Sequence, residues 1–137
     1  MIEEAYVSFE TAKLLKEKGF DSNDVGSFGG FYSERCYESG YGVITQSGQE
    51  VGIVYDDLTN SELDHDKYLR PTQQMAMRWL REVHHLLIKI IWTGYEGLFS
   101  WDIDNMYNGD WKNIDKEYSS YEEAVEAAIE YCLTNLI

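Results

Sequence analysis

The sequence contains little proline, little cysteine and few basic residues. Pro71 is the single proline, which argues against a proline-rich linker. Two cysteines, Cys36 and Cys132, are far apart and form neither a zinc-ligand pattern nor a disulfide framework. We expect both to be reduced thiols, with one disulfide as the alternative. The most apolar run, residues 86–92, is interrupted by Lys89 and is too short to span a bilayer.

The first residues, Met1 to Glu4, are acidic and lack the basic start and apolar stretch of a signal peptide. The absence of this signal and of a membrane-spanning run makes the cytoplasm the expected compartment.

Basic residues are outnumbered, with 11 Lys and Arg against 25 Asp and Glu, so the formal net charge is −14. Such a surface repels the phosphate backbone of nucleic acids and the head groups of anionic membranes. Direct binding to either is therefore not expected. The same charge attracts a basic protein surface.

The 137 residues are 44% hydrophobic and 15% aromatic, which is typical of a folded protein and not of an acidic tail. A chain of this length is expected to form a single domain, residues 1–137, without a metal or disulfide to stabilise it.

Hydrophobic periodicity, caps and turn residues predict the order α–β–β–β–α–β–β–α. The helices are expected after Ser8, after Pro71 and after Ser120, and the strands at residues 31–37, 42–46, 50–56, 86–92 and 95–103. Ser47 and Gly48 predict a tight hairpin turn, while residues 57–67 and 105–116 are expected to be irregular. Short turns between strands favour a mostly antiparallel sheet with helices packed on it, an α+β fold.

Side-chain patterns predict which faces are buried. Ala12 and Leu15 are expected in the core on the first helix, and residues 86–92 are apolar on nearly both sides, which is typical of a central strand. Phe99, Trp101 and Ile103 alternate onto one face of their strand. The middle helix is expected to bury Ala76, Trp79, Leu80 and Val83, and the last helix Tyr121, Ala124, Val125, Ala128, Ile129, Cys132 and Leu136.

Three stretches resemble a known family: Tyr6 to Leu15, Pro71 to His84, and Ser120 to Ile129. The sequence is similar there to a family of small uncharacterised proteins that are common in gut Bacteroidetes and in their phages and mobile elements. The resemblance implies an accessory role in a bacterium or phage. It transfers no activity and no functional residue.

The acidic segment 56–66 is the candidate metal site. Asp64, His65 and Asp66 are consecutive there, and carboxylate oxygens with one imidazole are ligands that a divalent cation accepts. A solvated acidic loop is the commoner interpretation of such a segment. A small ligand-binding domain or enzyme that uses this loop is the alternative to the function proposed next.

The charge layout of the last helix is the feature that folding explains least. Glu122, Glu126 and Glu130 follow one another at intervals of four residues, and each like-charge step costs about 0.2–0.5 kcal/mol. His84 and His85 diverge on their helix, and the glycine pairs lack the context of a phosphate loop, so no catalytic residue and no cofactor is indicated. We therefore expect a non-enzymatic protein–protein interaction domain with these glutamates as its binding residues. A mimic of nucleic acid is a sharper version of the same hypothesis.

Overall fold

The computed structural model describes residues 4–22, 29–33, 43–44, 50–52 and 59–137. It has an α+β fold with antiparallel sheets, as the sequence predicts. The chain divides into two compact units, Met1–Thr72 and Gln73–Ile137. The single domain that the sequence predicts over residues 1–137 is not tested by this division and stays a prediction. No described helix is both long and apolar enough to cross a membrane.

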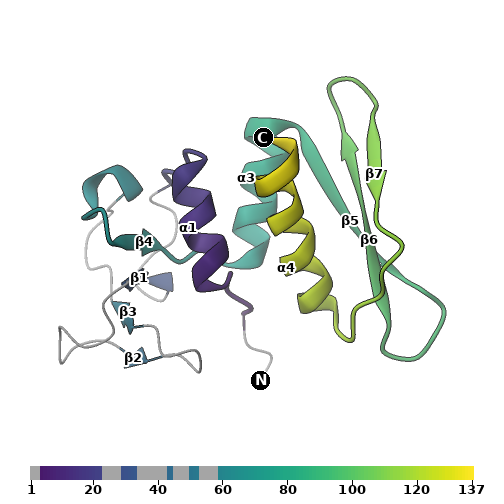
Figure 1. Cartoon of the computed structure of the whole chain (residues 1–137), viewed down its shortest axis with the longest axis horizontal. Helices are drawn as coiled ribbons and strands as arrows, with labels where there is room; N and C mark the ends of the chain where they lie inside the picture. The colour runs from purple at the N-terminus through teal and green to yellow at the C-terminus, as the bar shows by residue number, and fades with distance from the viewer. Residues whose placement is uncertain (1–3, 23–28, 34–42, 45–49, 53–58) are drawn as a thin grey trace. The chain divides into compact units, whose positions relative to one another are not determined.

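In its described residues, the first unit combines a helix with a sheet of short strands (Figure 1). The sheet has the order β2-β3-β1-β4, with antiparallel neighbours. Its elements are α1 (Phe9–Glu17), β1 (Phe31–Ser33), β2 (Val43–Ile44), β3 (Glu50–Gly52), the 3₁₀ turn η1 (Asn60–Glu62) and β4 (Lys67–Leu69).

Helix α1 begins and ends where its sequence predicts. Ser8 Oγ accepts a hydrogen bond from the Thr11 backbone N–H at 3.2 Å, and Gly19 ends the helix at φ 93°, a conformation that favours glycine. The expected core residues Ala12 and Leu15 are both fully buried.

The predicted strands of this unit are confirmed where the structure describes them. β2 and β3 fall inside the predicted ranges 42–46 and 50–56 and pair with each other, while the predicted turn at Ser47 and Gly48 lies outside the described residues. Of the predicted strand 31–37, Phe31–Ser33 is present as β1, and the remainder is likewise outside them. Strand β4 and turn η1 were not expected in or beside the segment 57–67, because three-residue elements are too short to show a period.

The second unit places two helices on a three-stranded sheet of order β5-β6-β7 (Figure 1). Ile88, Trp101 and Ile103 are buried on the face that the helices cover. The elements are α3 (Gln73–His84), β5 (Leu86–Trp92), β6 (Phe99–Asn105), β7 (Trp111–Asn113) and α4 (Tyr121–Tyr131), which continues into the π-helical turn η2 (Cys132–Leu136).

Two expectations for this unit were wrong. The segment 86–92 is not a central strand, because β5 lies at the edge of its sheet and leaves Ile91 and Trp92 exposed. Val83 was expected to be buried but is 55% exposed, because α3 ends one residue later, at His84, and its last turn is left uncovered. Ala76 and Leu80 are buried as expected.

The rest of the predicted pattern holds with local changes. Trp101 and Ile103 alternate into the core, and β7 forms inside the segment 105–116 that was expected to be irregular. On α4 the predicted stripe is buried at Ala124, Val125, Ala128, Ile129 and Cys132, whereas Tyr121 at the start of the helix is 39% exposed.

Candidate functional site

Helix α4 carries the predicted row of glutamates, Glu122, Glu126 and Glu130, which we call the acidic row. Two reciprocal contacts fix the start of this helix. Ser120 Oγ accepts from the Glu123 backbone N–H at 3.1 Å, which confirms the predicted capping residue. The Glu123 carboxylate reaches back and accepts from the Ser119 hydroxyl at 2.6 Å and from its backbone N–H at 3.3 Å. The first turn of α4 is therefore held rigidly, with Glu122 beside it.

The glutamates line one side of α4, next to its buried face. Glu122 and Glu130 are exposed, and Glu126 is half-buried between them. Because side chains four residues apart lie on one face of a helix, the three carboxylates share a side. The structure thus brings together the residues that the sequence selected.

Glu126 differs from its two neighbours because it contacts the start of α3. The buried side chain of Gln73 donates from Nε2 to Glu126 Oε2 at 3.1 Å and to the Glu122 backbone carbonyl at 3.0 Å. Gln73 therefore joins α3 to the first turns of α4. No local sequence pattern indicates this contact, since Gln73 and Glu126 are 53 positions apart in the chain.

The arginines of α3 were the groups that could have neutralised the acidic row. Arg78 instead pairs with Glu82 of its own helix, with Nε and Oε1 at 3.1 Å. Within the described ranges, no ion pair joins Glu122 or Glu130 to a basic residue. These two carboxylates remain available to a partner.

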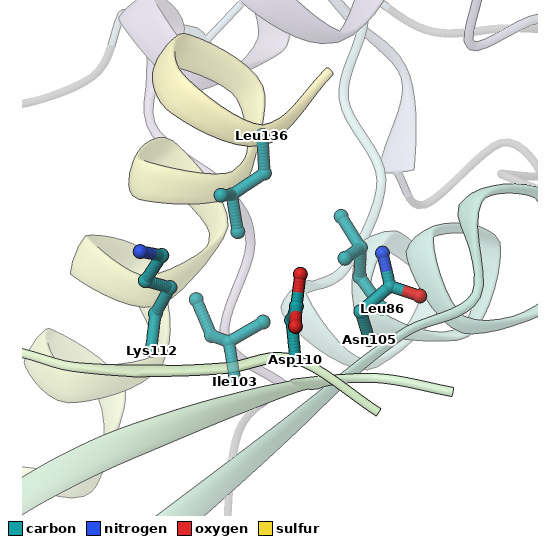
Figure 2. Close-up of a pocket in the computed structure, with 6 residues that line it drawn as sticks. All are labelled: Leu86, Ile103, Asn105, Asp110, Lys112 and Leu136. Carbon is teal, nitrogen blue, oxygen red and sulfur yellow. The ribbon is translucent and has the colours of Figure 1, made fainter. Parts of the chain in front are cut away.

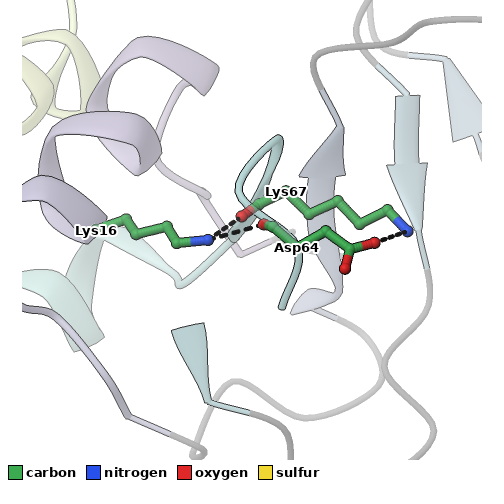
Figure 3. A network of polar contacts seen from close by, with 3 residues as sticks. All are labelled: Lys16, Asp64 and Lys67. Carbon is green, nitrogen blue, oxygen red and sulfur yellow. Dashed lines mark hydrogen bonds and ion pairs between the residues drawn. The ribbon is translucent and has the colours of Figure 1, made fainter. Parts of the chain in front are cut away.

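The candidate metal residues lie in the first unit, next to two lysines. Lys16 Nζ donates to the backbone carbonyls of Asp64 and Lys67 at 2.9 and 2.8 Å, and Lys67 Nζ lies 3.5 Å from Asp64 Oδ2 (Figure 3). Burial lowers the pKa of Lys16 below its ordinary value, although nearby carboxylates act in the opposite direction. Two amino groups beside Asp64 oppose the approach of a divalent cation.

The rest of this segment does not form a ligand set in the part of the chain that is described. His65 is exposed and Asp66 is half-buried, and no three metal-ligating side chains gather among the described residues. Asp56 and Asp57 lie outside the described residues. A metal ion here stays a prediction that none of these contacts favours.

Two polar residues explain instead why the segment takes its shape. Buried Asn60 donates from Nδ2 to the Phe20 carbonyl at 2.7 Å and accepts at Oδ1 from the Leu69 N–H at 2.8 Å. Asp21 accepts from the Ser61 N–H and hydroxyl at 2.8 and 2.9 Å. Burial acts to raise the pKa of Asp21, but these hydrogen bonds outweigh it and leave the pKa below its ordinary value.

The histidines and Cys132 have structural surroundings. His84 packs edge-on against Trp79 with ring centroids 4.7 Å apart, and exposed His85 stacks on Tyr107 at 6.0 Å. Cys132 is a free, buried thiol, and desolvation raises its pKa to about 12, so it stays protonated and is no nucleophile. Cys36 lies outside the described residues.

One small pocket lies between the sheet of the second unit and its C-terminal turn. Figure 2 shows Leu86, Ile103 and Leu136 around it, with Asp110 and Lys112 among its polar lining residues. Its volume of about 100 Å³ is well below the roughly 300–1,000 Å³ of ordinary ligand pockets. Sequence reasoning missed it because its walls come from segments far apart in the chain. At this size it supports no ligand assignment.

Comparison of the chain with protein-family models, with curated proteins and with solved structures finds no match. The residues of this chain are therefore the only guide to its function.

Proposed function

We propose that this chain is a non-enzymatic accessory protein that binds a basic surface of another protein through the exposed side of α4. Glu122 and Glu130 are the principal contacts, and Glu126 lies between them. The observation that carries the proposal is the exposure of Glu122 and Glu130 on a helix whose other side is fully buried. A bacterial or phage setting, which the family resemblance implies, is part of the same proposal.

The electrostatic reason is the accumulation of like charge. Three carboxylates four residues apart repel one another, and a basic partner converts that repulsion into attraction. Complementary charge mainly raises the association rate and fixes orientation, and its effect falls as salt is added. The rigid capping of α4 at Ser120 means that little order has to be gained on binding.

Mimicry of nucleic acid is the sharper form of this proposal. Carboxylates four residues apart are separated by about 6 Å along the helix axis. Phosphates along one strand of B-DNA rise by about 3.4 Å each, so the match is loose. Competition between the chain and DNA for one basic partner would support mimicry. Binding that ignores added DNA would restrict the proposal to ordinary protein recognition.

The experiment compares two double variants of equal charge change. Glu122→Gln with Glu130→Gln removes the exposed carboxylates and leaves the hydrogen bond between Gln73 and Glu126 intact. Glu10→Gln with Glu17→Gln removes two exposed carboxylates from α1 as a matched control. Partners recovered from a bacterial lysate are purified and titrated against the wild type and both variants.

The expected result is weaker binding for the α4 variant alone, with a difference that shrinks as salt is raised. Two outcomes count against the proposal: recovery of no partner, or equal binding by the wild type and the α4 variant. An equal loss for both double variants also contradicts it, because the attraction would then come from overall charge and not from α4.

A further inference from the structure

Strand β5 presents the long open edge of the second unit. It pairs with β6 over all seven residues, Leu86–Trp92, and no strand or bridge in the described part of the chain pairs with its other side. The opposite edge of the sheet, β7, has only three residues. An open edge is a row of unpaired backbone groups that accepts another strand, and its capacity grows with length.

The ladder determines which backbone groups are unpaired. Met106 N–H donates to the His85 carbonyl at 2.8 Å, and Thr93 N–H donates to the Leu98 carbonyl at 3.1 Å, so hydrogen-bonded pairs lie just before and just after β5. Hydrogen-bonded and non-hydrogen-bonded pairs alternate in an antiparallel ladder. The odd-numbered residues of β5 therefore bond to β6. The N–H and C=O groups that point to the open edge belong to Leu86, Ile88, Ile90 and Trp92.

Strand β5 has few of the features that usually keep a sheet edge from pairing with another chain. Lys89 is its only charged residue, and Lys89 Nζ lies 2.8 Å from Asp104 Oδ2 of the neighbouring strand. Ile91 and Trp92 are 39% and 62% exposed. The strand contains no proline, and its one cation is already paired with Asp104, so Lys89 protects the edge less than an unpaired lysine would.

We propose that a second copy of this chain pairs with β5, antiparallel and about a two-fold axis at Ile90, to give a continuous six-stranded sheet. In this register Lys89 faces the partner's Ile91, and Ile88 faces the partner's Trp92. Ile88, Ile90 and Trp92 then find partners in the facing strand, and of the outward-pointing residues only Leu86 faces a position beyond β5. Two-fold pairing of identical surfaces is also the commonest form of self-association.

Neighbouring registers are less favourable. An axis at Lys89 pairs all four outward-pointing residues, but it places two ammonium groups directly opposite each other, which is destabilising. An axis at Ile91 leaves the outward backbone groups of Ile88 without a facing residue of β5. A single strand pair buries little surface, so the dimer is weak and its population depends on protein concentration.

The register predicts opposite effects for two substitutions at one position. Ile91 is exposed on the face away from the helices, so its side chain can change without a change in the core. Ile91→Lys places a second ammonium opposite Lys89 at two symmetric places, and Ile91→Glu places a carboxylate there. Sedimentation velocity up to millimolar protein should show a dissociation constant that rises for Ile91→Lys and falls for Ile91→Glu, by roughly twofold to thirtyfold.

Matched controls stand at the other edge of the same sheet. Ile114 directly follows β7 and is 37% exposed, so Ile114→Lys and Ile114→Glu make the same charge changes away from β5. They should leave the dissociation constant within twofold of the wild-type value. All these variants retain Glu122 and Glu130. The test of self-association is therefore independent of the test of partner binding through α4.

Hydrogen exchange on the unaltered protein provides a second measurement, which does not depend on how a variant folds. The amides of Ile88, Ile90 and Trp92 should gain protection as protein concentration rises, while those of Leu87, Lys89 and Ile91 are protected throughout. A chain that sediments as a monomer at every concentration overturns the proposal. So does a dimer that ignores the charge at position 91. Protection of the even-numbered amides only after another protein is added would assign the edge to that protein and reject self-pairing.

Discussion

Gln73 and Glu126 are joined by a hydrogen bond of 3.1 Å between side chains 53 positions apart in the sequence. The same Gln73 amide also donates to the Glu122 carbonyl at 3.0 Å. One buried side chain thus fixes the start of α3 against α4. The contact divides the acidic row into a structural member, Glu126, and two exposed members, Glu122 and Glu130.

Gln73→Ala should destabilise the second unit by about 1–3 kcal/mol. The substitution removes two part-buried hydrogen bonds, one to the Glu122 carbonyl and one to the Glu126 carboxylate. Chemical denaturation measures the loss as a lower free energy of unfolding. Gln74→Ala, which changes the exposed neighbour on the same helix, is the control and should stay within about 0.5 kcal/mol of the wild type. Equal stabilities for the two variants would contradict the role given to Gln73.

Ser120→Ala should lower the free energy of unfolding by about 1 kcal/mol, because the Glu123 N–H loses its acceptor at the start of α4. Ser120→Asn retains a side-chain acceptor and should recover most of the loss. Ser8→Ala should have a similar cost in the first unit, where Ser8 caps α1. Loss of helical circular dichroism on heating is a suitable measurement. A Ser120→Asn variant no more stable than Ser120→Ala would show that the cap is not what matters.

Asn60→Ala should be the most damaging polar substitution tested in the first unit, by about 1–3 kcal/mol. It removes a donor from the Phe20 carbonyl and the side-chain acceptor of the Leu69 N–H. Ser61→Ala removes only an exposed hydroxyl bonded to Asp21 and is expected to cost less. Urea denaturation of both variants tests this order. The reverse order would show that Asp21, and not Asn60, holds the segment.

Acidification should destabilise the second unit through His84. Its Nε2 atom is buried without a hydrogen-bond partner, and desolvation, with the nearby charge of His85, lowers its pKa below the ordinary 6.5. The unfolded chain therefore takes up a proton first as pH falls. The contribution of His84 to stability is complete above pH 6.5 and is lost as pH falls from 6.5 through the folded-state pKa.

His84→Phe keeps a ring against Trp79 and removes the titrating group. The pH dependence of unfolding between pH 7 and 5 should become shallower in this variant than in the wild type. An NMR titration of the His84 ring measures its pKa in the folded chain. A value at or above 6.5 would contradict the predicted direction.

The sequence alone was sufficient where structure is decided within a few residues. Ser8 and Ser120 were predicted as caps because a capping hydrogen bond spans three residues, and both accept as expected. The alternation that buries Trp101 and Ile103 was visible for the same reason. The acidic row of α4 was also predicted from a spacing of four, since that spacing places side chains on one face of a helix.

Tertiary structure decided everything that depends on which segments meet. An apolar run such as residues 86–92 has the same sequence pattern whether the strand lies at the centre or at the edge of a sheet. The position of a strand depends on which other strands pair with it, and its own residues do not determine that. Only the ladder showed that β5 is an edge strand with Trp92 exposed. Likewise, three equivalent glutamates became unequal only when α3 brought Gln73 to Glu126, since hydrogen bonds across a long sequence separation leave no trace in local spacing.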